Sequence, residues 1–268
     1  MPVGRTPDSH SLPEAVYRLY AALAVTLPLD AERGLGGRLL YAGELGGDGR
    51  QLLFAANIAG AASLAASADP AVLRQAIRDG VIDFLVTSLE EALRILKNEI
   101  RKRQAVSVGV AVAPHVLAEQ MLDRGVLPDL LTPLSWGDSG RGATQEQGAK
   151  FIEQGSLPIL VGENRVEEDR RASDGSYVTW SVNHDFTRWL PRLDSVVEES
   201  LPSDDWVRQR WLRLAPRYLG RIAQREHGVA LSGDEMIRLR SLVLGLLAEH
   251  SQDEGKLPVV RIDGVPVG

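Results

Sequence analysis

The stretch RLLYAGELGGDGRQLLFAANIAGAASLAAS, residues 38–67, decides the fold of this protein. It begins with an apolar run and passes through a glycine-rich turn, AGELGGDGRQ at 42–51. A helical segment follows, and the stretch ends in a second apolar run, ASLAAS at 62–67. Two parallel strands need a helical crossover to join them, so this order of elements predicts a βαβ unit.

The same pattern continues along the chain to about residue 162. Further apolar runs occur at 83–87, 105–112, 128–132 and 157–162. Runs that are apolar on both faces are typical of strands that helices cover on both sides. Helix signals lie between the runs. Pro70 suits a first helical turn, and Ser88 with Glu91 forms a capping box. We predict an α/β fold over residues 1–162, with a Rossmann-like, doubly wound and mostly parallel sheet.

The sequence changes character after residue 162. Residues 163–176 are charged and rich in turn formers, and we expect an exposed loop there. Helical stretches are expected at about 185–200, 204–226 and 231–250, and Pro216 should kink or split the second of them. The final residues, KLPVVRIDGVPVG, suit either an edge strand or a tail. We assign residues 163–268 to an additional C-terminal helical region, packed on the same sheet or forming a small cap.

Composition excludes several classes of function. The chain has 268 residues, a formal net charge of −6 and no cysteine. An acidic chain is not expected to bind nucleic acid over its whole surface. Without cysteine there is no disulfide, thiolate metal site or cysteine nucleophile. No apolar run reaches the roughly 20 residues that span a bilayer, and no basic start precedes the first one. We therefore expect a cytoplasmic protein without membrane contact.

The glycine-rich turn is the first candidate ligand site. Its glycines are Gly43, Gly46, Gly47 and Gly49. Glycines between a strand and a helix let a phosphate approach the backbone, and the helix N-terminus supplies N–H groups and a positive dipole end. However, the spacing is not a regular G-x-G-x-x-G, and Glu44 and Asp48 would repel a pyrophosphate. A turn without a ligand is the alternative interpretation.

The loop that follows the run at 128–132 is the second candidate site. It carries polar side chains at Thr132, Ser135 and Asp138. Ligands of open parallel sheets bind beyond the carboxyl ends of the strands, which is where this loop must lie. We therefore expect the loop and the glycine turn to form one cleft for a nucleotide or another small molecule. A flexible polar connection is the alternative.

Two further patterns have a chemical and a structural interpretation. Four arginines, at 213, 217, 221 and 225, would lie near one helix face and could bind an anion, or they could form a solvated surface. The pair His184–Asp185 has the residue types for acid–base work, although a single pair on a loop is weak support. No two histidines have the helical spacing of metal ligands, so no metal site is expected.

Five collinear strings resemble the urocanase (urocanate hydratase) family over about residues 35–140. They are AGELGGDGRQ (42–51), NIAGAASLAASADP (57–70), SLEEALRILKNEIRKR (88–103), SVGVAV (107–112) and MLDRGVLPDLLT (121–132). The resemblance implies a Rossmann-like domain and NAD bound by the turn glycines and Asp69. It also implies lyase chemistry in histidine catabolism, in which NAD acts as an electrophile toward the imidazole ring of urocanate so that water can add.

The sequence also departs from the family pattern. The acidic residue that the family uses for the adenosine ribose falls at Ser67, and the family's active-site cysteine has no counterpart. The family's Q-T-S-A-H-D segment is shortened, so that only Ser135 and Asp138 correspond to it. The resemblance therefore implies a truncated, divergent member in which no catalytic residue can be assigned.

Three functions are compatible with this sequence. The chain could be a hydro-lyase with replaced catalytic groups, because an electrophilic cofactor leaves freedom in the residues around it. It could bind a nucleotide or metabolite without hydrating urocanate alone, as a homo-oligomer or with a partner subunit. It could also be a non-catalytic scaffold, since the fold alone does not determine function.

Overall fold

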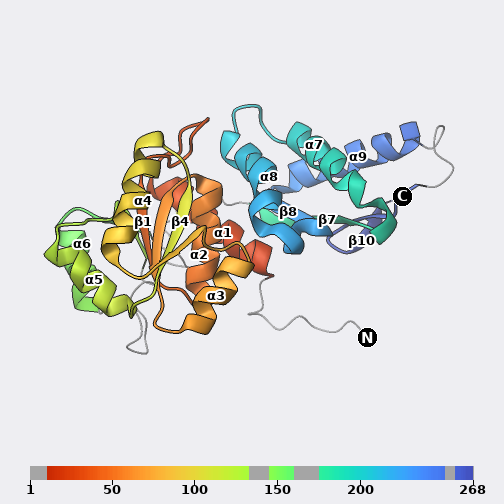
Figure 1. The fold of residues 1–268 in the computed structure, drawn as a ribbon. Helices are drawn as coiled ribbons and strands as arrows, with labels where there is room; N and C mark the ends of the chain where they lie inside the picture. The colour runs from red at the N-terminus through yellow and green to blue at the C-terminus, as the bar shows by residue number, and fades with distance from the viewer. Residues whose placement is uncertain (1–10, 133–144, 160–174, 251–256, 268) are drawn as a thin grey trace. The chain divides into compact units, whose positions relative to one another are not determined.

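The computed structural model describes residues 11–132, 145–159, 175–250 and 257–267 (Figure 1). The chain divides into two compact units. We call Arg18–Val166 the parallel-sheet unit, and we call Met1–Tyr17 with Glu167–Gly268 the antiparallel-sheet unit. Helix α1 (Leu12–Thr26) contributes residues to both. Among the described residues, no helix is both long and apolar enough to cross a membrane.

The parallel-sheet unit is built on six strands in the order β3-β4-β2-β1-β5-β6. The strands are β1 (Leu39–Glu44), β2 (Ala62–Ala66), β3 (Phe84–Val86), β4 (Val106–Val110), β5 (Leu130–Leu131) and β6 (Leu157–Pro158). Every neighbouring pair is parallel. Each apolar run that predicted a strand contains one, so the α/β, Rossmann-like prediction is confirmed.

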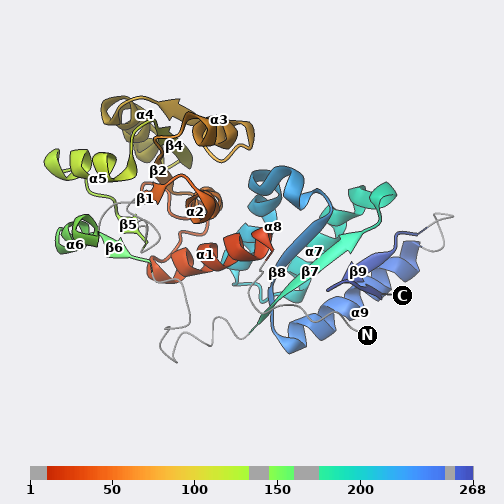
Figure 2. The same cartoon turned by 90° about the horizontal axis from the view of Figure 1, so that it is seen from below.

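Helices cover both faces of this sheet (Figure 2). They are α2 (Gly47–Ala59), α3 (Pro70–Arg78), α4 (Leu89–Lys102), α5 (Pro114–Asp123) and α6 (Gln145–Glu153). On one face, side chains of α4, α5 and α6 form a buried cluster with β1, β2 and β4. On the other, Asn57 of α2 accepts a hydrogen bond from Ser107 of β4, and a Cβ at Gly109 would meet Leu73 of α3 at 3.5 Å. The sheet is therefore doubly wound.

The strand order creates a switch point between β1 and β5. These two strands are neighbours, but β1 connects onward to β2 on one side and β5 connects onward to β6 on the other. Connections that leave in opposite directions open a crevice beyond the carboxyl ends of the two strands, and ligands of open α/β sheets bind there. The glycine turn follows β1 and Thr132 follows β5, so topology places both candidate sites at this crevice.

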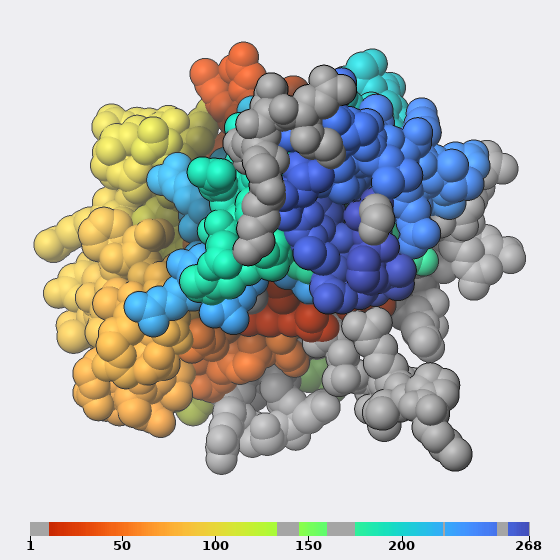
Figure 3. Space-filling view, turned by 90° about the vertical axis from the view of Figure 1, so that its right-hand side faces the viewer, coloured from red at the N-terminus to blue at the C-terminus, as the bar shows by residue number. Residues whose placement is uncertain are grey.

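The antiparallel-sheet unit contains a second sheet that the sequence analysis did not predict. Its four strands, in the order β10-β9-β7-β8, are β7 (Ser176–Val182), β8 (Glu226–Leu231), β9 (Val260–Ile262) and β10 (Val265–Val267). All neighbours are antiparallel. Its helical elements are η3 (His184–Trp189), α7 (Leu190–Ser200), α8 (Trp206–Leu219), η4 (Gly220–Gln224) and α9 (Gly233–His250). Figure 3 shows the surface over α9, β9 and β10 in blue.

One detail of the predicted helices needs correction. Pro216 does not split the helix but lies inside α8, which ends at Leu219. The helix stops instead before Gly220, whose φ of 54° favours glycine. Of the two alternatives for the final residues, the strand is the one found, because they form β9 and β10, and β10 lies at the edge of the sheet.

Candidate functional site

The turn between β1 and α2 has the backbone of a ligand-binding loop. The register of β1 against β2 shifts between Tyr41 and Gly43, which marks a bulge, and Gly43 has φ of 69°. Helix α2 then begins at Gly47, and no side chain caps it at Gly46. The first N–H groups of a helix have no partner within it, so this end of α2 offers donors to an anion.

Three glycines in this turn have three different roles. Gly43 lies in β1 just before the turn and supplies the positive φ at the bulge. At Gly49 a Cβ would lie 1.9 Å from the carbonyl oxygen of Glu44, so only glycine lets α2 pack this closely on β1. At Gly47 a Cβ would meet nothing within 4 Å, so the backbone there is open to a ligand. A tight turn, close approach to a pyrophosphate and close helix packing are the roles of the glycines in dinucleotide-binding folds.

The end of β5 lies beside this turn. Tyr41 of β1 pairs with Leu131 of β5, and the next residue, Thr132, is buried. The structure therefore brings Thr132 to the same sheet edge as Gly43, Gly46, Gly47 and Gly49. Ser135 and Asp138, the other two residues predicted for this side, lie outside the described residues.

Two carboxylates, from Asp69 and Glu44, lie near the end of β2 and have different roles. Asp69 is the N-cap of α3, where its Oδ1 accepts the N–H of Ala71 at 2.7 Å. Ser67 is buried, and its Oγ donates to a carboxylate oxygen of Glu44 at 3.2 Å. The sequence places serine where an acidic residue was expected. The structure shows that a carboxylate is nevertheless present, supplied by the last residue of β1.

A hollow in the parallel-sheet unit lies at the opposite edge of the sheet, where the strands begin. It has a volume of about 530 Å³ and is lined by residues such as Gly36, Arg38 and Arg103. Arg38 immediately precedes β1 and forms an ion pair with Asp129 at 2.8 Å, so this hollow lies at the amino ends of the strands. Ligands of this fold class bind at the carboxyl ends, so the hollow is not the predicted site.

Neither of the two additional patterns forms the predicted arrangement. Arg213 and Arg217 lie on α8, but Arg221 lies in η4 and Arg225 follows it, so the four do not share one helix face. His184 and Asp185 are 80% and 77% exposed with 3.6 Å between them, which leaves the pair in solvent. Among the described residues, no group of three or more histidine or acidic side chains could hold a metal ion.

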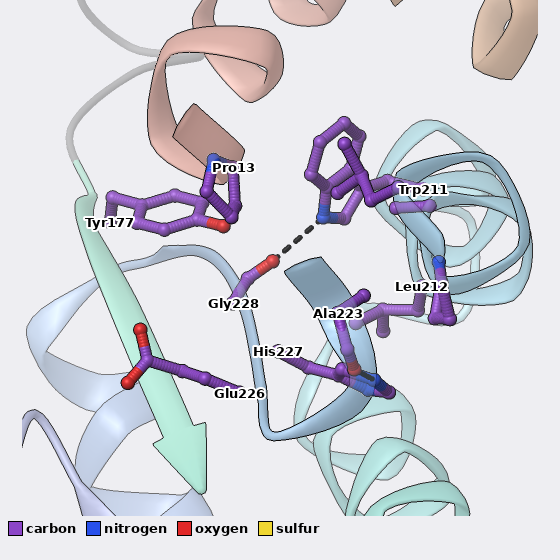
Figure 4. A pocket seen from close by; sticks show the side chains of 11 residues that line it. Pro13, Tyr177, Trp211, Leu212, Ala223, Glu226, His227 and Gly228 are labelled. Carbon is purple, nitrogen blue, oxygen red and sulfur yellow. Dashed lines mark hydrogen bonds between the residues drawn. The ribbon is translucent and has the colours of Figure 1, made fainter. Parts of the chain in front are cut away.

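The antiparallel-sheet unit contains a small cavity lined by Tyr177, Trp211 and His227 (Figure 4). Its volume of about 10 Å³ accommodates roughly one water molecule. The indole of Trp211 donates to the carbonyl of Gly228 at 2.7 Å, as the dashed line in the figure shows. Both ring nitrogens of His227 are also engaged, with Asp194 at 2.8 Å and with the carbonyl of Ala223 at 2.7 Å. These polar groups hold the unit together.

Burial also perturbs the tyrosines near this cavity. Burial raises the pKa of Tyr17 to about 12, and the ring of Tyr17 lies edge-on to Trp211 with 4.9 Å between centroids. The pKa of Tyr177 is also raised by burial. Phenols with raised pKa values stay protonated at neutral pH, so these two tyrosines contribute by packing and carry no charge.

Residues 19–136 match the family model of the urocanase Rossmann-like domain. These residues are less than half of the chain and are similar to the Rossmann-like domain of the urocanase family, and we call them the urocanase domain. The match covers β1 to β5, the glycine turn and Thr132, while the antiparallel-sheet unit lies outside it. The carboxyl ends of β1 and β5 therefore lie inside the matched range.

Proposed function

We propose that the urocanase domain binds NAD at the switch point between β1 and β5, in a urocanate hydratase-like function linked to histidine catabolism. The observation that carries this proposal is the contrast between Gly47, where the backbone is open, and Gly49, where no side chain fits. An open glycine at the helix start and a closely packed glycine two residues later match two of the glycine roles in dinucleotide-binding turns.

The residues of the site fit a dinucleotide. The N–H groups at Gly46 and Gly47 would face the pyrophosphate at the positive end of α2. Gly43 shapes the end of β1 before the turn, and Thr132 lies on the β5 side of the crevice. Asp69 lies at the end of β2, on the side that receives the adenosine half in Rossmann-like folds. When bound, NAD supplies the electrophile of the hydration chemistry in this family.

Assembly is a further part of this proposal. The proposed cofactor site leaves the groups that activate water unassigned. A second copy of this chain or a partner subunit could bring them to the crevice. Light scattering of the purified protein, with and without NAD, measures whether the chain is an oligomer.

The first test is to look for NAD in the purified protein. We expect acid denaturation to release NAD in near-stoichiometric amount, identified by its ultraviolet absorbance and mass. If the protein is purified without cofactor, added NAD should raise the thermal unfolding temperature. No released NAD and no thermal shift would contradict the proposal and leave a Rossmann-like scaffold. Protein with NAD should then be assayed with urocanate by the loss of its conjugated absorbance.

The second test is Gly47→Val. The added side chain would project into the open crevice, so NAD binding should be abolished while the thermal unfolding temperature of the free protein is unchanged. Gly245→Val is the matched control, because Gly245 is also a helical glycine with nothing within 4 Å of its Cβ position. Unchanged NAD binding in Gly47→Val would remove the turn from the site.

A further inference from the structure

The carboxylate of Glu44 occupies the position where the sequence has lost its ribose-binding acid. In dinucleotide-binding folds, an acidic residue about 20 residues after the glycine turn accepts a hydrogen bond from the ribose 2′-hydroxyl. The residue 20 positions after Gly47 is Ser67, which carries no charge. The structure therefore raises the question of what replaces that acid.

Strand register brings Glu44 to this position. Glu44 is the last residue of β1 and pairs with Ala66, the last residue of β2. Because the two strands are parallel neighbours, their carboxyl ends meet at one edge. Ser67 follows Ala66 directly, so the end of β2 lies within reach of the Glu44 side chain.

The hydrogen bonds of Ser67 orient that side chain. Its Oγ accepts the N–H of Asp69 at 3.2 Å and donates its single proton to Oε1 of Glu44 at 3.2 Å. A serine hydroxyl has one donor, so the backbone contact on its acceptor side directs that donor toward the carboxylate. Ser67 is buried, which fixes this arrangement. The carboxylate is half-buried and is held at the end of β2 by this hydrogen bond. The stem of the side chain passes beside the start of α2, where a Cβ at Gly46 would lie 3.4 Å from Cγ of Glu44.

We propose that Glu44 is the ribose-binding and specificity-determining carboxylate of this chain, with Ser67 as its positioning residue. This inference rests on the proposed NAD function. A carboxylate accepts hydrogen bonds from the 2′-hydroxyl of the adenosine ribose and repels a 2′-phosphate. The chain therefore selects NAD over NADP. The side chain that seemed to oppose a pyrophosphate in the sequence instead serves the neighbouring ribose.

Asp69 is the competing carboxylate at the same edge. It lies two residues beyond Ser67 and is exposed, but its Oδ1 caps α3. Asparagine is also a good N-cap, so Asp69→Asn removes the charge and keeps the helix start. Glu44→Gln likewise keeps an oxygen that can accept from Ser67. The two variants are matched in chemistry and differ only in which carboxylate they neutralise.

The experiment measures dissociation constants of three probes for the full chain and both variants. The probes are NAD, NADP and an NAD that lacks the 2′-hydroxyl of its adenosine ribose. A hydrogen bond to a charged group converts to about a 10- to 100-fold change in affinity. The unmodified chain should bind the 2′-deoxy probe weaker than NAD by this factor, and NADP weaker still. In Glu44→Gln, NAD should bind about tenfold weaker, and the loss caused by removing the hydroxyl should shrink to under about threefold. In Asp69→Asn, whatever its affinity for NAD, the loss caused by removing the hydroxyl should stay at about 10- to 100-fold.

The outcomes separate this inference from the proposed function. If the unmodified chain binds NAD and Glu44→Gln remains as sensitive to the missing hydroxyl, Glu44 does not bind the ribose, and the NAD proposal stands. If Asp69→Asn removes the sensitivity instead, the carboxylate is Asp69. If the unmodified chain binds none of the three probes, both proposals are overturned. Thermal unfolding of each variant checks that the chain is folded.

Discussion

The two units of this protein use their polar side chains in opposite ways. In the parallel-sheet unit, Glu44, Ser67 and Thr132 lie at the carboxyl ends of neighbouring strands, where the fold leaves a crevice. In the antiparallel-sheet unit, Arg208 and His227 are each engaged by more than one acceptor inside the unit. The comparison teaches that polar and charged side chains indicate a ligand-binding site only when the fold places them at a sheet edge that a ligand can reach.

The largest loss of stability is expected from a substitution at Gly49, where α2 packs closely on β1. Gly49→Ala would place a methyl group 1.9 Å from the carbonyl oxygen of Glu44, and this backbone oxygen cannot move away cheaply. The free energy of unfolding should fall by about 3 kcal/mol or more. Chemical denaturation measures this loss. Hydrogen exchange should show that it is confined to the parallel-sheet unit.

Gly47→Ala is the control for this prediction. Its Cβ has open space, so the stability change should stay below about 0.5 kcal/mol. Equal destabilisation by the two alanines would mean that both glycines serve packing. Gly47 would then no longer differ from Gly49 as an open position that a ligand can approach.

The second prediction concerns the ion pair of the antiparallel-sheet unit. The guanidinium of Arg208 binds both carboxylate oxygens of Glu235 at 2.7 and 2.8 Å, and the side chain of Glu235 is only 7% exposed. Glu235→Gln would leave the Arg208 charge poorly compensated, and stability should fall by about 2–3 kcal/mol. Glu99→Gln, which breaks an ion pair with Lys102 on α4, should cost below about 0.5 kcal/mol.

This pair also predicts a pH dependence. Burial by itself raises the pKa of Glu235, but hydrogen bonds from Arg208 and from the backbone of Ser232 outweigh it, and the pKa is lowered overall. A carboxyl group with a lowered folded-state pKa stabilises the protein above its ordinary pKa, here 4.5, and loses this contribution as the pH falls through the folded-state value. Denaturation below about pH 4.5 should therefore show a shallower loss of stability for Glu235→Gln than for the unmodified chain. Parallel curves would contradict the assignment.

The smallest effect is expected at Asp48. This exposed carboxylate lies in the first turn of α2, where it would repel a pyrophosphate and also interact favourably with the helix dipole. Asp48→Asn should tighten NAD binding by about two- to fourfold and lower stability by only a few tenths of a kcal/mol. The gain in affinity should shrink as salt is added. A gain that is insensitive to salt would point to a contact other than charge.

Local sequence patterns determined most of the parallel-sheet unit. The apolar runs contain all six strands, Pro70 begins α3, and Ser88 caps α4 by accepting the N–H of Glu91. The carboxylate of Glu91 in turn accepts the N–H of Thr87. These features could be predicted because caps, helix periodicity and short apolar runs depend on residues a few positions apart.

The second sheet could be predicted only in part. The β7 sequence SYVTWSV alternates in burial, with Val178, Trp180 and Val182 buried, and this alternation was a readable signal. However, β7 pairs with β8 and β9, whose residues lie about 50 to 80 positions further on. Nothing in the local pattern specifies such distant partners, so sequence analysis predicted the helices of this unit without its sheet.

The sequence by itself determined the α/β class, the glycine turn and the identity of the side chains at each strand end. Only the tertiary structure decided that β4 lies between β2 and β3, and that β1 and β5 are neighbours at a switch point. It also decided that Glu44 stands where Ser67 lacks a charge. The physical reason is that strand register decides which side chains of neighbouring strands lie side by side. Register in turn depends on the packing of the whole sheet.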